Sequence, residues 1–418
     1  MKGRSLRLAV VANEFLAPGI GRTGGFGWAA RAVARAFRAH PEVGIDVVFL
    51  TGEIRSPDGA RETALDGTRL LFKQRKWWEA LPALRQERID LILTVDYRPS
   101  YHRLFWLLPR TPIIVWARDP RTPDDVSRID TLRIPGQEDV LPQGIGHIDC
   151  TSLASMARRS RLVGRKIVVA SKFPHIADKL VATYGMGGTD VLPNPDVFDY
   201  TLPVGAKHLS PRVAFLARLD PYKRPWLFVE LARRFPEVEF LLLGRCHFQG
   251  PGSWQPAELP ANVKVMGHVE GEEKRRLLAS SWVLVNTSIY EESPVSMLEA
   301  LACETPVLSC VDTGGIAARF GVYAGRFDGT GLEGLPALEA GLRQLLENCE
   351  ARERLGREGR AWVMREHSTE RFLEAFGAIV SRLGMRTGSI APEYVPDPTT
   401  IVSITGELHG AQRVSRSP

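Results

Sequence analysis

Two glutamates stand eight residues apart in the segment YEESPVSMLEALACETPVLS, which spans residues 290–309. Glu291 lies before a proline, Pro294, and Glu299 lies in the helical pattern that follows it. An apolar run at 283–286 precedes both acids and predicts a strand. One carboxylate in the loop after a strand and a second inside the next helix suit a ligand that carries two separate sets of hydroxyl groups.

The proline between these acids predicts the start of a helix, because its missing N–H costs nothing in the first helical turn. The free N–H groups of Val295, Ser296 and Met297 would then point out of the helix end, where the helix dipole attracts phosphate. Glu291 is placed to reach a sugar joined to that phosphate, and Glu299 to bind a ribose diol. The segment therefore predicts a site for a nucleotide-sugar.

Two cations, Arg218 and Lys223, follow the strand pattern at 213–216 in VAFLARLDPYKRP. When a nucleoside diphosphate leaves a sugar, negative charge builds on its phosphates, and two cations with a helix N-terminus can stabilise that charge. The sequence contains no Asp-x-Asp pair that would hold a metal on a diphosphate. We therefore expect a reaction that requires neither a metal nor a cofactor.

These residues also have a plainer interpretation. Glu291 and Glu292 could be solvated loop acids, Glu299 an exposed helix residue, and Arg218 with Lys223 a solvated basic turn. For an isolated pair of acids at this spacing, the plainer interpretation is favoured. The neighbouring strand, proline and cations together favour a ligand site.

The length of 418 residues predicts two domains. Strand-like and helical patterns alternate, pause in a proline-rich segment at 191–211, and then restart. We expect an α/β protein of two doubly wound, Rossmann-like domains that face each other across a cleft, over residues 1–195 and 196–368. A closing helix at about 369–384 is expected to pack back on the first domain, and residues 386–418 to form a mobile tail.

The second half of the chain resembles the retaining glycosyltransferases of family four (group 1), which have the GT-B fold. The resemblance rests on a loop acid, seven residues and a second acid before an alanine-rich motif, here Glu291, ESPVSML, Glu299 and ALACETPVLS. It implies that Glu291 contacts the hydroxyls of the donor sugar and that Glu299 contacts the ribose of the nucleotide. It also implies that Arg218 and Lys223 contact the donor diphosphate.

The same resemblance assigns further residues to the donor. Gly267 and His268, in VKVMGHVEG, would lie beside the base, and Gly244 at the rim of the cleft. Gly24 and Gly25, in GGFGWAARAVARAF, resemble the glycine loop of the family, which lets the backbone approach the donor phosphate closely.

The sequence departs from the family pattern in the donor segment. Residues 292–294 replace the usual Gly-Phe-Gly after the loop acid. Glu304 stands where the family has a glycine, although a left-handed backbone there would disfavour any other residue.

The acceptor side is defined less closely, because the resemblance is loose in the first half of the chain. Asn194, in LPNPDV, matches the PNG of the family at the domain junction. The family places a histidine after an N-terminal strand near the reacting sugar, where this chain has Arg118 and Asp119. These two residues, together with His102 and His147, are the acceptor-side candidates.

The expected function is transfer of a sugar from a nucleotide-diphosphate sugar to an acceptor hydroxyl, with retention and without a metal. Two alternatives remain open: a GT-B-like nucleotide-sugar epimerase or phosphorylase, and a non-catalytic domain that binds nucleotide-sugar or glycan. An epimerase would release an altered sugar with no acceptor present. The base, the sugar and the acceptor are not specified by the sequence.

The net charge of +6 suits an anionic partner. No nucleic-acid-binding signature accompanies it, so we expect no nucleic-acid partner. Arg31, Arg35 and Arg38 share one face of the helical segment 28–39, for which a solvated surface is the main interpretation and peripheral contact with anionic lipid the weaker one. The five scattered cysteines and the lack of a bilayer-spanning apolar run favour a cytoplasmic protein, with the inner face of the membrane as the alternative place.

Overall fold

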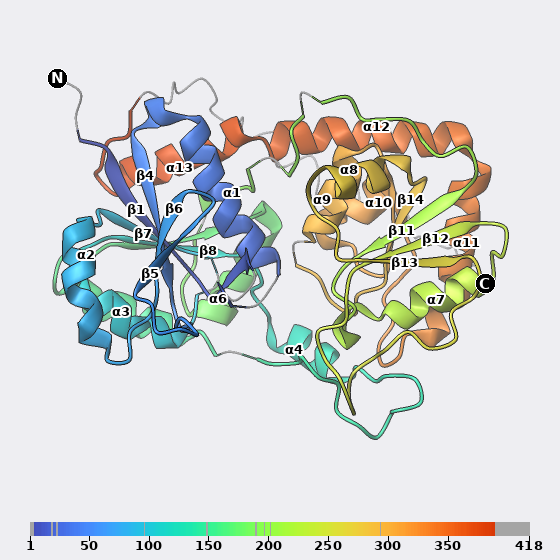
Figure 1. Ribbon diagram of the computed structural model, residues 1–418, viewed down its shortest axis with the longest axis horizontal. Coiled ribbons are helices and arrows are strands. Elements are labelled where there is room, and N and C mark those ends of the chain that lie inside the picture. Colours follow the sequence, from blue (N-terminus) through green and yellow to red (C-terminus); the bar gives the residue numbers. More distant parts are fainter. Residues whose placement is uncertain are drawn as a thin grey trace, which may run out of the picture.

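The computed structural model describes residues 4–17, 20–21, 24–95, 97–147, 149–188, 190–195, 197–200, 202–292 and 294–388. Two α/β domains lie side by side, the N-terminal one on the left and the C-terminal one on the right in Figure 1. Each has a mostly parallel sheet with helices on both faces, and the predicted fold class is thereby confirmed.

The N-terminal sheet has eight strands in the order β10-β9-β8-β7-β1-β4-β6-β5. Its central strand β1 reads LRLAVVA, a nearly continuous apolar run, because helices cover the sheet on both faces. The strands are β1 (Leu6–Ala12), β4 (Ile45–Thr51), β5 (Glu62–Leu65), β6 (Thr68–Leu71), β7 (Leu91–Thr94), β8 (Ile113–Ala117), β9 (Ile167–Ser171) and β10 (Asp190–Val191). A separate antiparallel pair is formed by β2 (Glu14–Ala17) and β3 (Ile20–Gly21).

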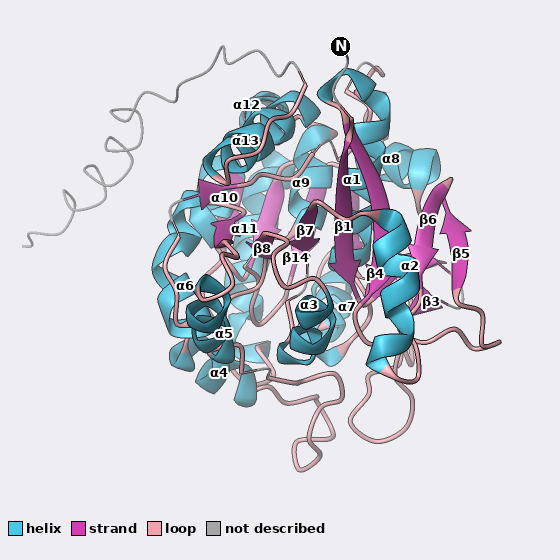
Figure 2. Cartoon of the chain, turned by 90° about the vertical axis from the view of Figure 1, so that its left-hand side faces the viewer, coloured by secondary structure: helices cyan, strands magenta, loops and turns pink. Residues whose placement is uncertain are grey.

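Helices from both ends of the chain cover the N-terminal sheet (Figure 2). On one face, α1 (Gly25–Ala39) packs with the last helix, α13 (Thr369–Arg382), and the rings of Phe37 and Phe376 meet edge to face at 5.0 Å. The apolar side chains of the other face join those of α2 (Leu81–Glu87), α3 (His102–Leu107), α5 (Ser152–Arg161) and α6 (Ala177–Tyr184).

The C-terminal sheet has six parallel strands in the order β13-β12-β11-β14-β15-β16. They are β11 (Arg212–Leu216), β12 (Glu239–Leu243), β13 (Val263–Gly267), β14 (Val283–Asn286), β15 (Val307–Ser309) and β16 (Gly321–Tyr323). One face packs on α7 (Pro225–Arg233) and α11 (Leu335–Glu347). The other packs on α8 (Gly271–Ser280), α9 (Val295–Ala302), α10 (Ile316–Phe320) and α12 (Cys349–Glu366). α12 then leads along the top of the molecule in Figure 1 to α13.

One segment before residue 195 packs on the C-terminal domain. Ile129 in α4 (Pro123–Asp130), together with Leu132 and Ile134 after it, completes the apolar core beneath α7. Arg128 of α4 is 3.1 Å from a carboxylate oxygen of Asp328. A single boundary at 195/196 therefore does not describe how this segment packs, because its apolar side chains are buried in the second core.

An antiparallel hairpin at the sheet edge was not among the expected strands. β5 and β6 pair across Asp66 and Gly67, whose φ angles are 49° and 69°. An Asp-Gly pair with two positive φ angles is typical of the tightest hairpin turn. The hairpin adds an antiparallel edge to a sheet that was expected to be parallel throughout.

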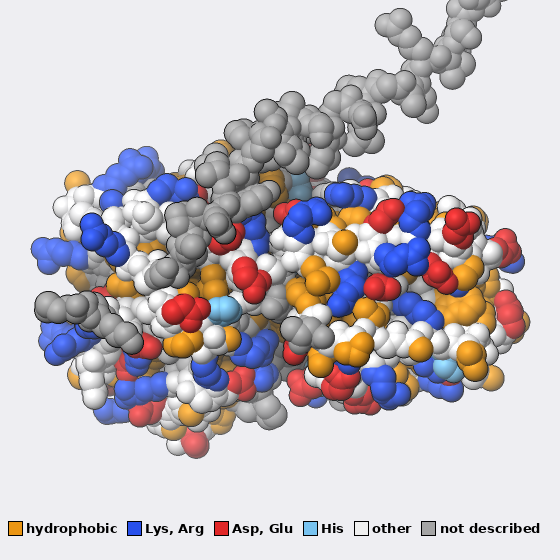
Figure 3. All heavy atoms as spheres, turned by 90° about the horizontal axis from the view of Figure 1, so that it is seen from above, with side chains coloured by type: hydrophobic (Ala, Val, Ile, Leu, Met, Phe, Trp, Pro, Cys, Tyr) orange, Lys and Arg blue, Asp and Glu red, His pale blue; other side chains and the backbone are white. Residues whose placement is uncertain are grey.

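The predicted mobile tail at 386–418 lies almost wholly outside the described residues, which end at 388. Within the described ranges, no helix combines the length and the apolar character needed to cross a bilayer. On the face seen from above, acidic and basic side chains are interspersed over both domains (Figure 3).

The arginines of α1 do not form one free basic face. Arg31 lies 2.6 Å from Asp66, and Arg38 donates a hydrogen bond of 2.5 Å to Thr68. Arg35 is exposed. The hairpin β5–β6 thus binds two of the three arginines for which lipid contact was the weaker interpretation.

Candidate active site

A cavity of about 970 Å³ lies between the two domains. Its C-terminal wall comprises the loops after β11, β12 and β14 with the start of α9, and its N-terminal wall comprises the loops after β1 and β8 with α1. Doubly wound domains bind ligands in this place, beyond the carboxyl ends of their strands. The predicted site residues that line the cavity are Glu291, Arg218, Lys223, Gly24, Gly25, Gly244, His268, Pro294, Val295, Ser296, Glu299, Arg118 and Asp119.

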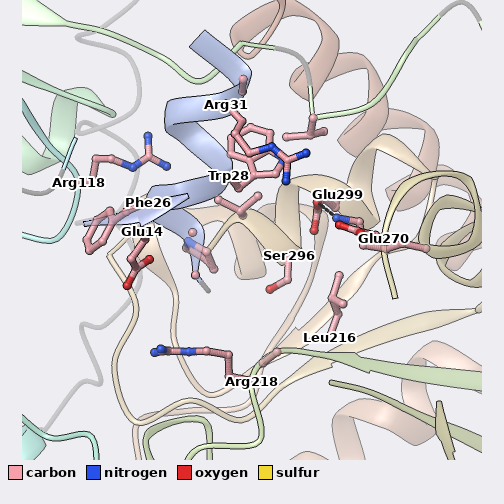
Figure 4. Close-up of a pocket in the computed structure, with 18 of the residues that line it drawn as sticks. Glu14, Phe26, Trp28, Arg31, Arg118, Leu216, Arg218, Glu270, Ser296 and Glu299 are labelled. Carbon is pink, nitrogen blue, oxygen red and sulfur yellow. Dashed lines mark hydrogen bonds and ion pairs between the residues drawn. The ribbon is translucent and has the colours of Figure 1, made fainter. Parts of the chain in front are cut away.

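The helix that follows the loop acids begins one residue later than predicted. Pro294 is the N-cap of α9, and its carbonyl accepts the N–H of Met297 at 3.1 Å. Met297 is therefore not one of the free donors that the sequence suggested. Val295 and Ser296 line the cavity, and Figure 4 shows Ser296 there. The N–H groups of these two residues have no acceptor within the helix, because they belong to its first turn, so two backbone donors remain at this end.

Arg218 extends from the loop after β11 into the cavity (Figure 4). Its Nε lies 3.0 Å from Oδ2 of Asp220, and the two side chains are 40% and 3% exposed. The loop after β12 approaches closely because its first residue is Gly244, where a Cβ would lie 1.9 Å from the carbonyl oxygen of Ala217. The buried Asp220 thus orients a partly solvated arginine toward the cavity.

Lys223 and Glu291 form an ion pair on the same wall. Their side chains are 18% and 12% exposed, so solvent screens this pair only in part. The hydroxyl of Ser288 donates to Glu291 at 2.7 Å, and that of Thr313 donates to the Glu291 carbonyl at 2.6 Å. Beside Lys223, the buried Arg224 donates to two carbonyls after β14, which joins the loops that carry the ion pair.

Glu299 also has a partner, which the sequence did not reveal. The ammonium group of Lys274, on α8, lies 2.6 Å from Oε1 of Glu299, and the side chains are 15% and 6% exposed (Figure 4, dashed line). Both residues line the cavity. The carboxylate of Glu299 is therefore fixed by an ion pair inside the cleft, and Glu299 is not the exposed helix residue of the plainer interpretation.

Glu292 faces the N-terminal domain. Its carboxylate is 3% exposed and accepts hydrogen bonds from Lys179 of α6, at 2.7 Å, and from the hydroxyl of Tyr290. Lys179 also lies 3.0 Å from Asp125 of α4. The pKa of Glu292 is raised, because burial is the largest effect, and the hydrogen bonds from Lys179 and Tyr290 offset only part of that rise. Glu292 is thus not a solvated loop acid, because it links the loop after β14 to the N-terminal domain.

The start of α1 forms part of the N-terminal wall. Gly24 is an extended N-cap, and a Cβ there would lie 2.3 Å from a carboxylate oxygen of Glu14. A Cβ at Gly25 would meet nothing within 4 Å. The helix end therefore opens onto the cavity, with Trp28 one turn further along (Figure 4).

The acceptor-side pair Arg118 and Asp119 follows β8, and both residues line the cavity. Arg118 is 5% exposed and donates to Oδ1 of Asn194 at 2.7 Å. Asp119 accepts a hydrogen bond of 2.7 Å from Arg121. Burial lowers the pKa of Arg118 to about 9.

Three predicted residues do not line the cavity. His102 lies at the start of α3 and bonds a neighbouring tyrosine hydroxyl. His147 is exposed, with its Nε2 2.9 Å from Asp130. Gly267 ends β13, and the segment that lines the cavity begins at the next residue, His268. The structure therefore gives no support to an acceptor-side role for either histidine, because each points to a partner elsewhere.

The sequence reasoning did not assign the residues that pair with its predicted charges, which are Lys274 at Glu299, Asp220 at Arg218, and Lys179 and Tyr290 at Glu292. Lys274 and Lys179 pair with acids distant in the sequence, and Lys274 also reads as part of an ordinary charged stretch, EEKRR. A signal existed for Asp220, which stands two residues after Arg218 in the same loop. Within the described ranges, no three His, Cys, Asp or Glu side chains form a metal-binding group.

Residues 204–362 match the family model described as glycosyl transferases group 1. None of the curated proteins matches the sequence significantly. The match lies within the C-terminal half of the chain, and it covers the wall of the cavity that carries both glutamates.

Several solved structures resemble the whole chain. A sucrose-phosphate synthase from Thermosynechococcus elongatus matches with a TM-score of 0.65 and 19% identity, covering 91% of this chain and 99% of its own. A glycosyltransferase from Rickettsia africae matches with 0.63 and 12%, covering 91% and 98%. Anabaena HepE in complex with UDP-glucose matches with 0.60 and 14%, covering 90% and 100%. At such low sequence identities the structural likeness establishes the fold alone, which is GT-B.

Proposed function

We propose that this protein is a retaining, metal-independent glycosyltransferase that moves a sugar from a nucleotide-diphosphate sugar to an acceptor hydroxyl. The observation that carries the proposal is the C-terminal wall of the cavity. There Arg218, Lys223 and the start of α9 adjoin two glutamates, each of which is held by a lysine. The glycosyltransferase match covers all of these residues.

The donor diphosphate would lie at the start of α9. The N–H groups of Val295 and Ser296 and the side chains of Arg218 and Lys223 supply donors and positive charge there. As the bond between the anomeric carbon and the phosphate oxygen breaks, the electron pair stays on that oxygen. These groups are in place before the bond breaks, so they stabilise the new charge without reorganisation.

The two glutamates would bind the ends of the donor on either side of the phosphates. Glu291, in the loop before α9, would contact the sugar hydroxyls and steady the positive charge at the anomeric carbon. Glu299, one turn inside α9, would accept hydrogen bonds from the ribose diol, with Lys274 holding its carboxylate in position. In retention the acceptor oxygen attacks the face that the phosphate leaves, and the departing phosphate oxygen can accept the acceptor's proton.

The structure supports Glu291 over Glu292 as the acid at the sugar. Glu291 pairs with Lys223, which is one of the proposed phosphate cations. The carboxylate of Glu292 is taken up by Lys179 and Tyr290.

The test is a panel of nucleotide-sugars, scored by thermal shift, by donor hydrolysis and by NMR of the product anomer. UDP-glucose is a natural first member, because HepE was solved with it. Transfer with a retained anomer in the presence of a chelator supports the proposal, and an inverted anomer or loss of activity on chelation contradicts it. Release of an altered sugar in the absence of an acceptor would indicate an epimerase. A requirement for inorganic phosphate as the acceptor would indicate a phosphorylase. A thermal shift with no turnover would indicate a binding domain.

A further inference from the structure

Arg118 is a buried cation on the N-terminal wall of the cavity. Its side chain is 5% exposed, and its guanidinium is directed toward the space between the walls (Figure 4). Its hydrogen bond among the described residues is to the neutral oxygen of Asn194. No carboxylate of the described residues forms an ion pair with Arg118, and the adjacent Asp119 is bound to Arg121.

A buried charge is costly unless an opposite charge or a ligand compensates it. Burial leaves Arg118 with a pKa of about 9, so it is still charged at neutral pH. Lys172, at the end of the adjacent strand β9, is also buried, and its pKa is lowered first by burial and then by the charge of Arg118. Of these two cations, Arg118 is the one that lines the cavity, so the positive charge that faces the cavity here is that of Arg118.

The guanidinium is fixed in place without a ligand. Its central carbon lies 4.4 Å from the centroid of the Trp116 ring, and the indole N–H of Trp116 donates to the carbonyl of Leu192 at 2.7 Å. Asn194 is fully buried, and its Nδ2 has no hydrogen-bond partner in the described residues. The remaining N–H groups of Arg118 are thus oriented in advance, which lowers the entropy lost on binding.

We propose that Arg118 binds an anionic group, a carboxylate or a phosphate, carried by one of the two sugars that meet in the cleft. The planar fork of arginine matches both groups with two parallel hydrogen bonds. The proposal rests on the proposed function, because the cleft is taken to hold a donor sugar and an acceptor. The group has two sources: a uronate donor, or an acceptor that bears a phosphate or carboxylate.

Two matched pairs of substrates distinguish these sources. The donors are UDP-glucose and UDP-glucuronate, or the same pair on the nucleotide that the panel selects, and the acceptors are a monosaccharide and its phosphate ester. The wild type should prefer the anionic member of one pair by about 10- to 100-fold in kcat/KM, the effect of one charged hydrogen-bonded contact. Arg118→Gln should abolish this preference, and Arg118→Lys should keep part of it.

A binding measurement serves where no acceptor is yet known. Inorganic phosphate is titrated into protein saturated with UDP, so that the donor phosphate site is already filled. Thermal stabilisation of the wild type, absent in Arg118→Gln, is the expected result. Arg165→Gln is the matched control: Arg165 is equally buried, burial lowers its pKa to about 10, and it donates to carbonyls away from the cavity. The Arg165→Gln variant should be less stable than the wild type and should keep the wild-type preference in both substrate pairs.

Equal kcat/KM for the neutral and the anionic member of both pairs would overturn the anion site, and so would a preference for the anionic member that persists in Arg118→Gln. Donor hydrolysis and UDP binding are measured on the same preparations. If these succeed while the anion preference is missing, only the further proposal fails. If they fail, the proposed function fails, and phosphate titration of the nucleotide-free wild type against Arg118→Gln still decides whether the arginine binds an anion.

Discussion

Lys223 is the cation whose loss should reduce turnover most. Removal of one preorganised group that stabilises charge in a transition state costs about 2.7–4 kcal/mol, or roughly 10²–10³-fold in kcat. Lys223 is 18% exposed and is held by Glu291, so Lys223→Met should show this full effect. Arg218 is 40% exposed, and water around it already screens part of its charge. For Arg218→Met we therefore expect a smaller loss, about 10- to 100-fold.

The assay is steady-state transfer with the donor that the nucleotide-sugar panel selects, together with the dissociation constant of the nucleoside diphosphate. Lys264→Met is the matched control, because Lys264 also pairs with a glutamate but is 61% exposed and lies outside the cavity. Circular dichroism and thermal unfolding establish that the variants fold. A folded Lys223→Met that keeps full turnover would refute the phosphate role. A greater loss in Arg218→Met than in Lys223→Met would refute the ranking by exposure.

Four further outcomes are expected. Glu291→Gln should lose most transfer yet bind nucleoside diphosphate, whereas Glu292→Gln should be far milder in transfer; rates for both variants check this, and the reverse order would place the wrong acid at the sugar. Glu299→Gln should raise the donor KM more than it lowers kcat, because a ribose contact is made about equally in ground and transition states; unchanged donor affinity with a large fall in kcat would contradict it. Glu304→Gly should raise the free energy of unfolding by about 0.5–1 kcal/mol, because residue 304 has a φ of 54°; a denaturant titration measures it, and a lower stability would show that the strain is compensated. Liposomes with and without anionic lipid should pellet equal amounts of protein, because the hairpin β5–β6 binds two of the three arginines of α1; enrichment on anionic lipid would restore the lipid interpretation.

The parts of the site that were predictable are local in the chain. Glu291 and Glu299 follow one strand and flank one helix start, and Arg218 and Lys223 follow another strand, so their spacing alone places them at sheet ends. The left-handed backbone was also anticipated at Glu304, from a glycine in the resembling family. Such features can be predicted from a single sequence, because residues that are close in the chain remain close in the fold.

What escaped prediction depends on partners brought together by the fold. Lys274 meets Glu299 from a separate helix, and Lys179 meets Glu292 from the other domain. Charge patterns cannot distinguish such residues from solvated lysines, because the pairing partner is decided by packing. The missed hairpin is different: its Asp66-Gly67 turn was visible in the sequence and is a strong hairpin signal.

The two walls of the cleft differ in how their charges are compensated, and this difference indicates where specificity resides. On the C-terminal wall, Arg218, Lys223 and Lys274 each have a carboxylate within the protein, so this wall is preorganised, and it is the wall to which we assign the proposed donor. On the N-terminal wall, Arg118 has a neutral amide and an aromatic ring but no carboxylate of the described residues. The family match covers the residues of the first wall named here, and it begins at residue 204, after Arg118 in the chain. An anion that the protein does not itself supply would balance Arg118, and the substrate that brings it is the one that the glycosyltransferase match leaves unspecified.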